Sequence, residues 1–410
     1  MKSKSLSALL SALLFIGTSC GEDKFNKPEF VNPDGGTGTV ETPKPGKIYS
    51  WEQERKGILD YTDMVLFYGG GRQRYIANWD EDRISSYVTY TDEKGNETWF
   101  FDAFLFLEFA DYGTGSSMVT YATGYTDPST GKILNSATKA DWQRLADYYF
   151  THNHNLDELD KTVGKAAGRL GAPKTKRRVV ITIPEPIKTR NTSVAGSPST
   201  YWGKLDDATL DFSKSEDRVK ACCWYIDYIR ALFNDRAYRN IELAGFYWIS
   251  EKATESQDIL APVSEYLHGL NYSFNWIPFF TAAGYDQWKK WGFDYAFYQP
   301  NYFFKADNES SDTLSGRLDE ACEQGLKAGM GMEMEFDDNA LASFGTNCRA
   351  YKLRNYMKAF RRHKVWDNCR LAYYQGNNTV HSLKTSTREE DKALYHEFGN
   401  VVTSRPYRSK

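Results

Sequence analysis

Short apolar runs alternate with amphipathic stretches along the chain from residue 49 onward. Eight of the apolar runs have the length and the near-continuous hydrophobicity of strands that are buried on both faces of a parallel sheet. These runs are 63–70, 101–109, 177–186, 241–251, 272–280, 293–304, 331–338 and 369–376. Between them, apolar residues at helical spacing predict helices that include 141–163, 215–233, 314–329, 347–363 and 387–398.

Eight strands that are each followed by a helix or a long connection predict a (β/α)8 barrel of the TIM type. The alternative is an open doubly wound sheet, but no strand is followed by a glycine-rich turn with nucleotide-binding spacing. The segment YGGGRQR at 68–74 lacks the phosphate-binding pattern and indicates a loop after the first strand. We therefore expect one α/β barrel domain over residues 49–405.

The seventh predicted strand, GMEMEFDD at 331–338, carries acidic residues on one face. Because side chains alternate along a strand, the apolar residues point one way and Glu333, Glu335 and Asp337 point the other way. Burying an unpaired carboxylate costs several kcal/mol. This face therefore either meets cations, such as Arg370 on the eighth strand, or lines a site that uses the acids.

The N-terminus has the features of an export signal. MKSK is positively charged, LSALLSALLFIG is too short to span a membrane, and GTSC ends in Cys20. This resembles a bacterial lipoprotein signal, with residues 1–19 removed and Cys20 lipidated; the alternative is an ordinary signal peptide. Residues 20–48 are rich in Pro, Gly and Thr and predict a disordered tether. The acidic GEDKF after Cys20 favours display on the outer surface of the outer membrane.

The amino-acid composition indicates which classes of ligand the protein could bind. The 410 residues carry a net charge of −3, which argues against a nucleic-acid binder. The chain has 28 Tyr, 24 Phe and 11 Trp, and aromatic rings of this kind also stack on sugars. No Cys or His spacing is typical of a metal site, so we predict no cofactor and no metal. Carboxylates around Asp337 and Asp338 would suit Ca²⁺, but we do not adopt that alternative.

Active sites of such barrels lie at the C-terminal ends of the strands. Acids, amides and aromatic residues dominate these positions, and no Ser or Cys nucleophile has a His partner. This set is suited to carbohydrate chemistry. The candidate ligand-binding residues are Glu185, Trp248, Tyr298, Gln299, Asn301, Tyr302, Glu333 and Asp337, and Tyr68 and Tyr374 also lie at strand ends.

Glu251, after the fourth strand, and Glu335, on the seventh, are the candidate catalytic pair. Retaining glycosidases need two carboxyl groups about 5–5.5 Å apart, and many barrel enzymes place them on these two strands. An inverting enzyme would instead use Asp337 or Glu185 as the base, with the acids about 6.5–9.5 Å apart. Glu251 as a solvent-facing loop acid is the competing structural interpretation.

The motifs FDAFLFL, GFYWISE, WIPFF, GFDYAFYQPNYFF and GMEMEFD occur in this order. Together they resemble a bacterial family of extracellular proteins named as a domain of unknown function (family 4855), from Ile48 to the C-terminus. The resemblance implies a barrel related to glycoside hydrolases without implying a demonstrated activity. The positions that match it are Trp248, Glu251, Gln299, Asn301, Tyr302, Glu333 and Glu335.

We therefore predict a glycoside hydrolase-like lipoprotein that acts on a poly- or oligosaccharide through a retaining double-displacement mechanism. The alternatives are a non-catalytic glycan-binding lipoprotein and a purely structural role.

Overall fold

A computed structural model describes residues 58–114, 117–126, 131, 133–188, 200–305 and 311–409. The predicted signal peptide at 1–19, Cys20 and the predicted tether at 20–48 lie outside these residues. In the part of the chain that the structure describes, no helix is both long and apolar enough to cross a membrane.

Eight parallel strands close into a barrel, which confirms the predicted (β/α)8 fold. Each strand lies inside one of the eight apolar runs, and around the barrel each pairs with its neighbour in chain order. The last strand pairs with the first: Asp63 lies opposite Leu371. The barrel strands are β1 (Asp63–Tyr68), β4 (Ala103–Leu107), β8 (Arg177–Ile183), β11 (Ile241–Trp248), β12 (Ser273–Trp276), β13 (Tyr295–Tyr298), β14 (Gly331–Glu335) and β15 (Leu371–Tyr374).

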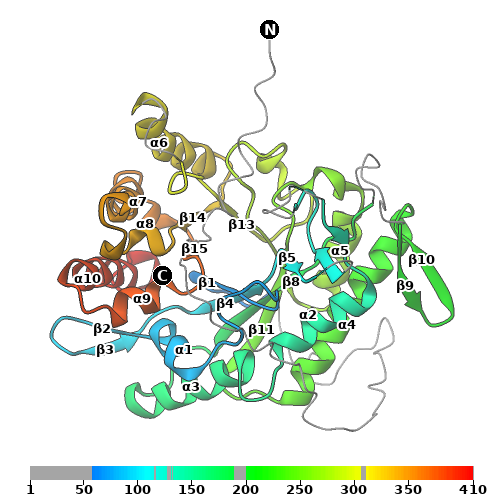
Figure 1. The fold of residues 1–410 in the computed structure, drawn as a ribbon, viewed down its shortest axis with the longest axis horizontal. Coiled ribbons are helices and arrows are strands. Elements are labelled where there is room, and N and C mark those ends of the chain that lie inside the picture. The colour runs from blue at the N-terminus through cyan, green and yellow to red at the C-terminus, as the bar shows by residue number, and fades with distance from the viewer. Residues whose placement is uncertain are drawn as a thin grey trace.

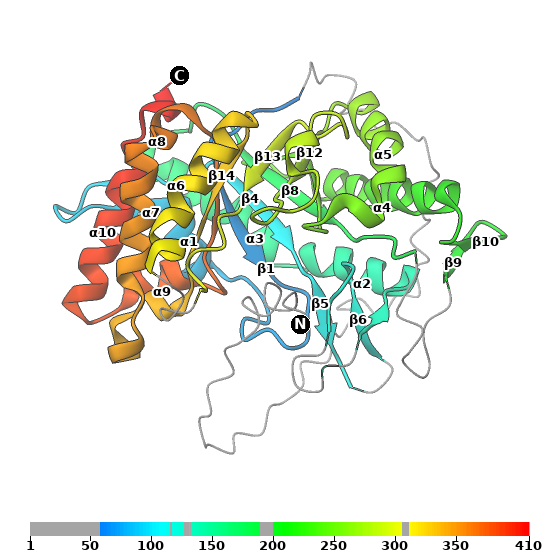
Figure 2. The same ribbon diagram turned by 90° about the horizontal axis from the view of Figure 1, so that it is seen from above.

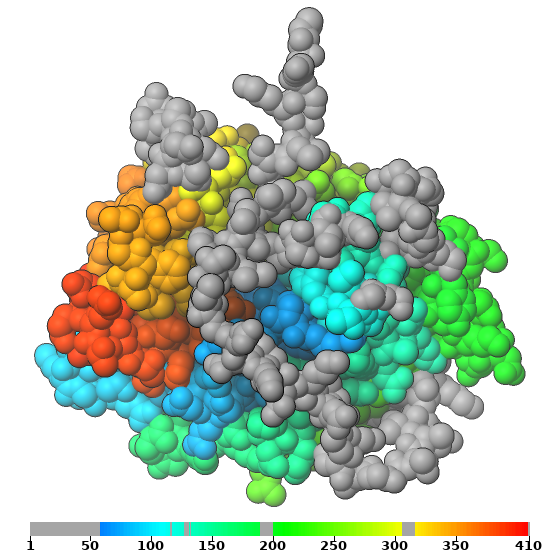
Figure 3. All heavy atoms as spheres, in the orientation of Figure 1, coloured from blue at the N-terminus to red at the C-terminus, as the bar shows by residue number. Residues whose placement is uncertain are grey.

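Helices surround the strands on the outside (Figure 1), and α6, α7 and α10 lie next to one another on one side of the barrel (Figure 2). The helices are α1 (Glu81–Val88), α2 (Lys139–Tyr149), α3 (Asn155–Leu170), α4 (Ser215–Arg236), α5 (Gln257–Gly269), α6 (Ser311–Lys327), α7 (Ala350–Arg362), α8 (Val365–Asn368), α9 (Thr379–Thr385) and α10 (Glu389–Thr403). In the space-filling view, segments near the start of the described chain adjoin those near its end (Figure 3).

Short strands decorate three of the loops. They form a hairpin after α1, a three-stranded sheet after β4 and a ribbon before α4 that projects from the edge of the molecule (Figure 1). These strands are β2 (Thr89–Thr91), β3 (Glu97–Trp99), β5 (Ala110–Tyr112), β6 (Met118–Thr120), β7 (Asn135–Ser136), β9 (Tyr201–Leu205) and β10 (Ala208–Asp211).

The prediction of one helix over 141–163 is wrong, because the chain forms α2 and α3 with a turn between them. Asn153 and Asn155 adopt positive φ angles of 60° and 50° in this turn. Asparagine tolerates this left-handed conformation better than most residues, and it interrupts a right-handed helix.

Strand alternation separates two apolar layers. Met64, Leu66 and Phe297 fill the barrel interior. Met332 and Met334 belong instead to the layer between the strands and the helices, together with Phe336 at the end of the same strand. The predicted opposite directions of the apolar and acidic side chains are therefore confirmed, with the apolar ones facing the helices and the acids facing the barrel axis.

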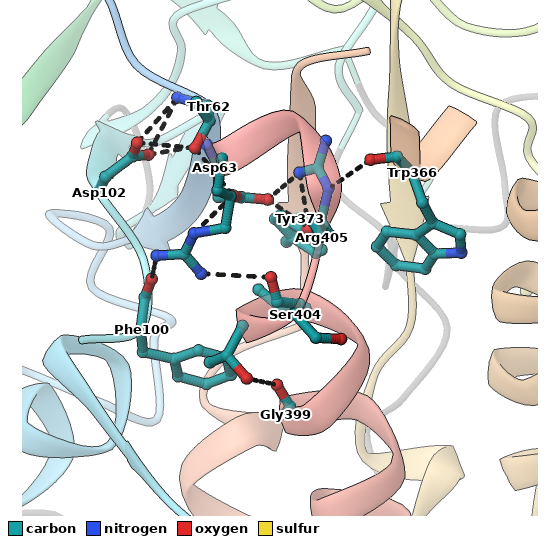
Figure 4. A network of polar contacts seen from close by, with 12 residues as sticks. Thr62, Asp63, Phe100, Asp102, Trp366, Tyr373, Gly399, Ser404 and Arg405 are labelled. Carbon is teal, nitrogen blue, oxygen red and sulfur yellow. Dashed lines mark hydrogen bonds and ion pairs between the residues drawn. The ribbon is translucent and has the colours of Figure 1, made fainter. Parts of the chain in front are cut away.

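A buried ion pair closes the N-terminal end of the barrel (Figure 4). Arg405, just after α10, donates to Asp63 at the start of β1 and to the carbonyl of Cys369, and both ion-pair side chains are fully buried. The Tyr373 hydroxyl donates to Asp63 at 2.6 Å. These contacts join the first strand, the last strand and the C-terminal segment.

We expect Arg405→Ala to lower the free energy of unfolding by about 3 kcal/mol, because the buried Asp63 carboxylate then keeps only the more distant Arg408, at 3.6 Å, and the Tyr373 hydroxyl. Urea denaturation measures the change. Arg169→Ala, which removes an exposed pair with Glu97, is the matched control and should cost about 1 kcal/mol or less. Equal losses in the two variants would contradict the role of the buried pair.

Candidate active site

Three glutamates from two strands meet at the C-terminal end of the barrel. Glu333 and Glu335 lie on β14, and Glu251 follows β11. Burial raises the pKa of Glu333 and of Glu251. The charges of Glu335 and Glu251 raise that of Glu333 further, and the charge of Glu335 raises that of Glu251 further. We call Glu251, Glu333 and Glu335 the glutamate cluster.

Glu335 is fully buried and is held by hydrogen bonds to both carboxyl oxygens. Its Oε2 accepts from the Tyr356 hydroxyl and from the backbone N–H of Asn301, each at 2.6 Å. Its Oε1 accepts from Nε2 of Gln299 at 3.2 Å. Burial raises the pKa of Glu335 to about 7, although these hydrogen bonds favour the ionised form.

Glu251 is half-buried, and it faces the same amide as Glu335. Burial and the charge of Glu335 raise the pKa of Glu251 to about 7, while a hydrogen bond with Gln299 lowers it. Both carboxyl groups therefore lie beside the side chain of Gln299. Since a charge on either group opposes a charge on the other, we expect the pair to hold one proton near pH 7.

Glu333 lies two residues deeper than Glu335, and its side chain is 1% exposed. It lies opposite Ala372 on β15. No residue in the described part of the chain donates a hydrogen bond to its carboxyl group. Burial and the two neighbouring glutamates hold the pKa of Glu333 well above its usual range.

Four tyrosines surround the cluster: Tyr68 on β1, Tyr125 after β6, Tyr247 on β11 and Tyr374 on β15. Burial is the main cause that raises the pKa of each of these tyrosines. The charge of Glu333 adds to it for Tyr68, Tyr247 and Tyr374, and the charge of Glu251 adds to it for Tyr125. Within the described segments, none of these four hydroxyls has a hydrogen-bond partner. We call them the tyrosine group.

Sequence reasoning placed Tyr68 and Tyr374 at strand ends but missed Tyr247 and Tyr125. Tyr247 precedes Trp248, and strand alternation sends one of the two into the barrel and the other out of it. The direction of each was readable only with the register of β11. Tyr125 comes from the long connection after β4, where no periodicity indicates the direction of a side chain.

Arg74 lies in the glycine-rich loop after β1. Its guanidinium forms two hydrogen bonds of 2.6 Å with Glu108, which is fully buried at the end of β4, and lies 4.7 Å from the Tyr68 ring centre. The charge of Arg74 is therefore matched by Glu108, and the pair fixes the loop after β1 beside the tyrosine group.

Three aromatic residues predicted to bind ligand point away from the cluster. Trp248 is buried against Phe274 in the outer layer. The Tyr298 hydroxyl donates to Gln324 on α6 at 2.7 Å. The Tyr302 ring packs at 75° against Tyr356, and the Tyr302 backbone is the part that supports Glu335. Alternation explains the outward direction of Trp248 and Tyr298, which lie next to inward-facing positions.

Two of the other predicted site residues, Glu185 and Asp337, form hydrogen bonds within loops, whereas Gln299 contacts the glutamate cluster. Glu185 is buried and accepts hydrogen bonds from Thr123 and Ser256, each at 2.6 Å. Asp337 accepts from the backbone and the side chain of Asn339 at 2.9 and 2.7 Å. Gln299 contacts the cluster directly, and its Oε1 is buried without a partner among the described residues.

The structure does not bear out the alternative in which cations neutralise the acidic face. Arg370 on the eighth-strand side forms an ion pair with Asp60 at 2.7 Å, at the other end of the barrel. No group of three His, Cys, Asp or Glu residues among those that the structure describes is arranged to hold a metal ion.

Comparison with known proteins identifies the family. The model of the domain of unknown function DUF4855 matches residues 63–400. The chain belongs to the DUF4855 family. No curated protein matches its sequence.

Among solved structures, the DUF4855 barrel is similar to a family 18 chitinase from Crocus vernus, with a TM-score of 0.38 and 9% identity over 83% of this chain and 98% of that chain. It is also similar to a mutant tryptophan synthase alpha-subunit from Pyrococcus furiosus, with a TM-score of 0.31 and 8% identity over 86% and 100% of the two chains.

We expect Glu251→Gln to stabilise the DUF4855 domain at pH 8 by about 1–3 kcal/mol and to give no gain at pH 4. The pKa of Glu251 rises from 4.5 to about 7 on folding, so the folded state holds a proton that the unfolded state releases between these values. Stability is therefore lost as pH rises through this window, and glutamine cannot ionise. Urea denaturation at both pH values tests this. Glu390→Gln, at an exposed position, is the control, and an equal effect at both pH values would contradict the expectation.

Proposed function

We propose that this protein is a glycoside hydrolase that acts on a poly- or oligosaccharide. The observation that carries the proposal is the pair formed by Glu251 and Glu335 at the C-terminal end of the barrel. Both pKa values lie near 7, no cation pairs with either side chain among the described residues, and one amide contacts both. Glycoside hydrolysis requires one protonated and one ionised carboxyl group of this kind.

The surroundings suggest the division of roles. Glu335 accepts hydrogen bonds from Tyr356, Asn301 and Gln299, and these stabilise the carboxylate that attacks the anomeric carbon. Glu251 lacks such a set of donors, so it retains the proton that it delivers to the leaving oxygen. After the aglycone departs, Glu251 removes a proton from water, and the water hydrolyses the glycosyl ester on Glu335.

The same geometry favours a retaining mechanism. Retaining enzymes use two carboxyl groups about 5–5.5 Å apart, and Glu251 and Glu335 lie beside one amide side chain. The inverting alternatives require a carboxylate that is free to act as the base. The carboxylate of Glu185 instead accepts hydrogen bonds from two hydroxyl groups, and that of Asp337 accepts one from Asn339.

Polar side chains near the glutamate cluster could form hydrogen bonds with a carbohydrate. The Oε1 of Gln299 is buried without a partner among the described residues, which is uncommon in folded proteins, and the hydroxyls of the tyrosine group form no hydrogen bond there. A carbohydrate presents many hydroxyl groups that can donate to and accept from them, and tyrosine rings stack on its apolar faces.

One observation favours a non-catalytic glycan-binding protein instead. The Glu335 side chain is fully buried, and a nucleophile must reach the anomeric carbon. In this second candidate, the tyrosine group binds the glycan and Glu335 only positions the loop at Asn301.

Substitution of Glu251 and Glu335 distinguishes a glycoside hydrolase from a non-catalytic glycan-binding protein. We expect Glu335→Gln to abolish the release of new reducing ends from a glycan while glycan binding persists. Glu251→Gln should slow hydrolysis about 10²–10⁴-fold, and less for an aryl glycoside whose leaving group needs no proton. The control is Glu390→Gln at an exposed helix position. Turnover by Glu335→Gln at the wild-type rate would refute the proposal, and binding without any cleavage by the wild type would favour the second candidate.

We also propose that lipid on Cys20 anchors the protein in the outer membrane, with the barrel exposed at the cell surface. Its support is the sequence pattern that ends in GTSC, followed by the acidic GEDKF. The partners are then a carbohydrate and a membrane, without nucleic acid.

Replacing Cys20 by Ala is expected to move the protein from the membrane fraction to the soluble fraction, because the acceptor of the lipid is lost. Cell fractionation and protease treatment of intact cells measure anchoring and exposure. Cys369→Ala, which leaves Cys20 intact, is the control. Retention of Cys20→Ala in the membrane fraction would refute the anchor.

A further inference from the structure

Hydrolysis by two carboxyl groups leaves Glu333 without a role. It is 1% exposed and has no hydrogen-bond donor among the described residues. The titratable groups that face it are Glu335 on its own strand, Glu251 and Tyr247 from β11, Tyr68 from β1, Tyr374 from β15 and Tyr356 from α7.

No cation among the described residues forms an ion pair with Glu333. Arg74 is paired with Glu108, and Arg370 is paired with Asp60. The Lys252 ammonium group lies 5.4 Å from the ring centre of Phe279. Glu333 therefore has no counter-ion among the residues that the structure describes, and three neighbouring carboxylates cannot all be charged at low cost.

The three glutamates differ in how readily each of them ionises. Glu335 accepts hydrogen bonds that favour its anion, and Glu251 is half-buried. Glu333 has neither hydrogen bonds that favour its anion nor partial exposure to water, so it should be the last of the cluster to ionise as the pH rises. A protonated carboxyl group is a hydrogen-bond donor as well as an acceptor.

We infer that Glu333 remains protonated and is the specificity-determining donor that binds an uncharged oxygen of the substrate at the deepest point of the site. This inference rests on the proposed function and names its substrate class, a neutral glycan. The side chain opposite Glu333 on β15 is the methyl group of Ala372, which offers no polar partner in competition with the substrate. Leu66 and Phe297 belong to the apolar interior of the barrel.

Charge determines what this site rejects. A uronate carboxylate would be repelled by the anion on Glu335. An ammonium group would instead be attracted, and it would convert Glu333 into a carboxylate. The substitution Glu333→Gln distinguishes a neutral donor from a carboxylate, because the glutamine side chain retains a donor but cannot carry charge.

Infrared spectroscopy tests the protonation of Glu333 without a ligand. At pH 8.5, above the pKa of about 7 of Glu251 and Glu335, we expect a protonated-carboxyl C=O band that Glu333→Gln removes. The matched variant Glu251→Gln should leave this band in place. If Glu333→Gln removes no such band, Glu333 is ionised and the inference is overturned, whatever the outcome for hydrolysis.

Binding tests the substrate class. In the Glu251→Gln background, which hydrolyses slowly and keeps the Glu335 carboxylate, we measure the Kd of neutral glucose, xylose and mannose hexasaccharides, with hexagalacturonate and a glucosamine hexamer as charged probes. We expect a neutral probe to bind, Glu333→Ala to weaken it about 10-fold, and Glu333→Gln to keep Kd within about 3-fold.

Three outcomes would overturn the inference: preferred binding of a charged probe, equal losses in Glu333→Ala and Glu333→Gln, or no binding by any neutral probe. The release of reducing ends by the wild type tests the proposed function separately. A wild type that cleaves only a charged glycan would retain the function and lose this substrate class.

Discussion

Three carboxyl groups share one end of the barrel, and none of them forms an ion pair with a cation among the residues that the structure describes. Charge on Glu335 raises the free energy of charging Glu251 and Glu333, and burial adds to that cost. The protein therefore has to distribute protons among the three, and the hydrogen bonds to Glu335 decide where the negative charge rests. The chemistry that we propose depends on this unequal distribution, since an acid and a nucleophile must differ in protonation.

The cluster is held in place by structure that does not touch it. At the opposite end of the barrel, Asp63 and Arg405 join the first strand to the C-terminal segment (Figure 4). Beside the cluster, Arg74 and Glu108 hold the loop after β1. These structural acids are paired with arginine, whereas the three glutamates have no such partner among the described residues. That contrast distinguishes the site from the surrounding framework.

The fold could be predicted because strand hydrophobicity is a local property of the sequence. All eight barrel strands lie within the predicted runs, and the acidic face of GMEMEFDD follows from alternation alone. The turn at Asn153 and Asn155 was missed because the flanking residues keep helical periodicity across it. Alternation likewise put Trp248 and Tyr247 on opposite faces of β11 without showing which of the two lies inside. The structure places Tyr247 inside and Trp248 outside.

The sequence by itself determined the barrel, the shared face of Glu333 and Glu335 opposite the apolar side chains, and the presence of Glu251 after the fourth strand. These follow from spacing along one segment, which a chain carries before it folds. Only the tertiary structure decided which groups meet Glu335, that Arg370 lies with Asp60, and that the tyrosine group has no partners among the described residues. Those facts depend on strands far apart in sequence, whose mutual distances arise only when the barrel closes. Burial and proximity, which shift the pKa values, are therefore properties of the fold.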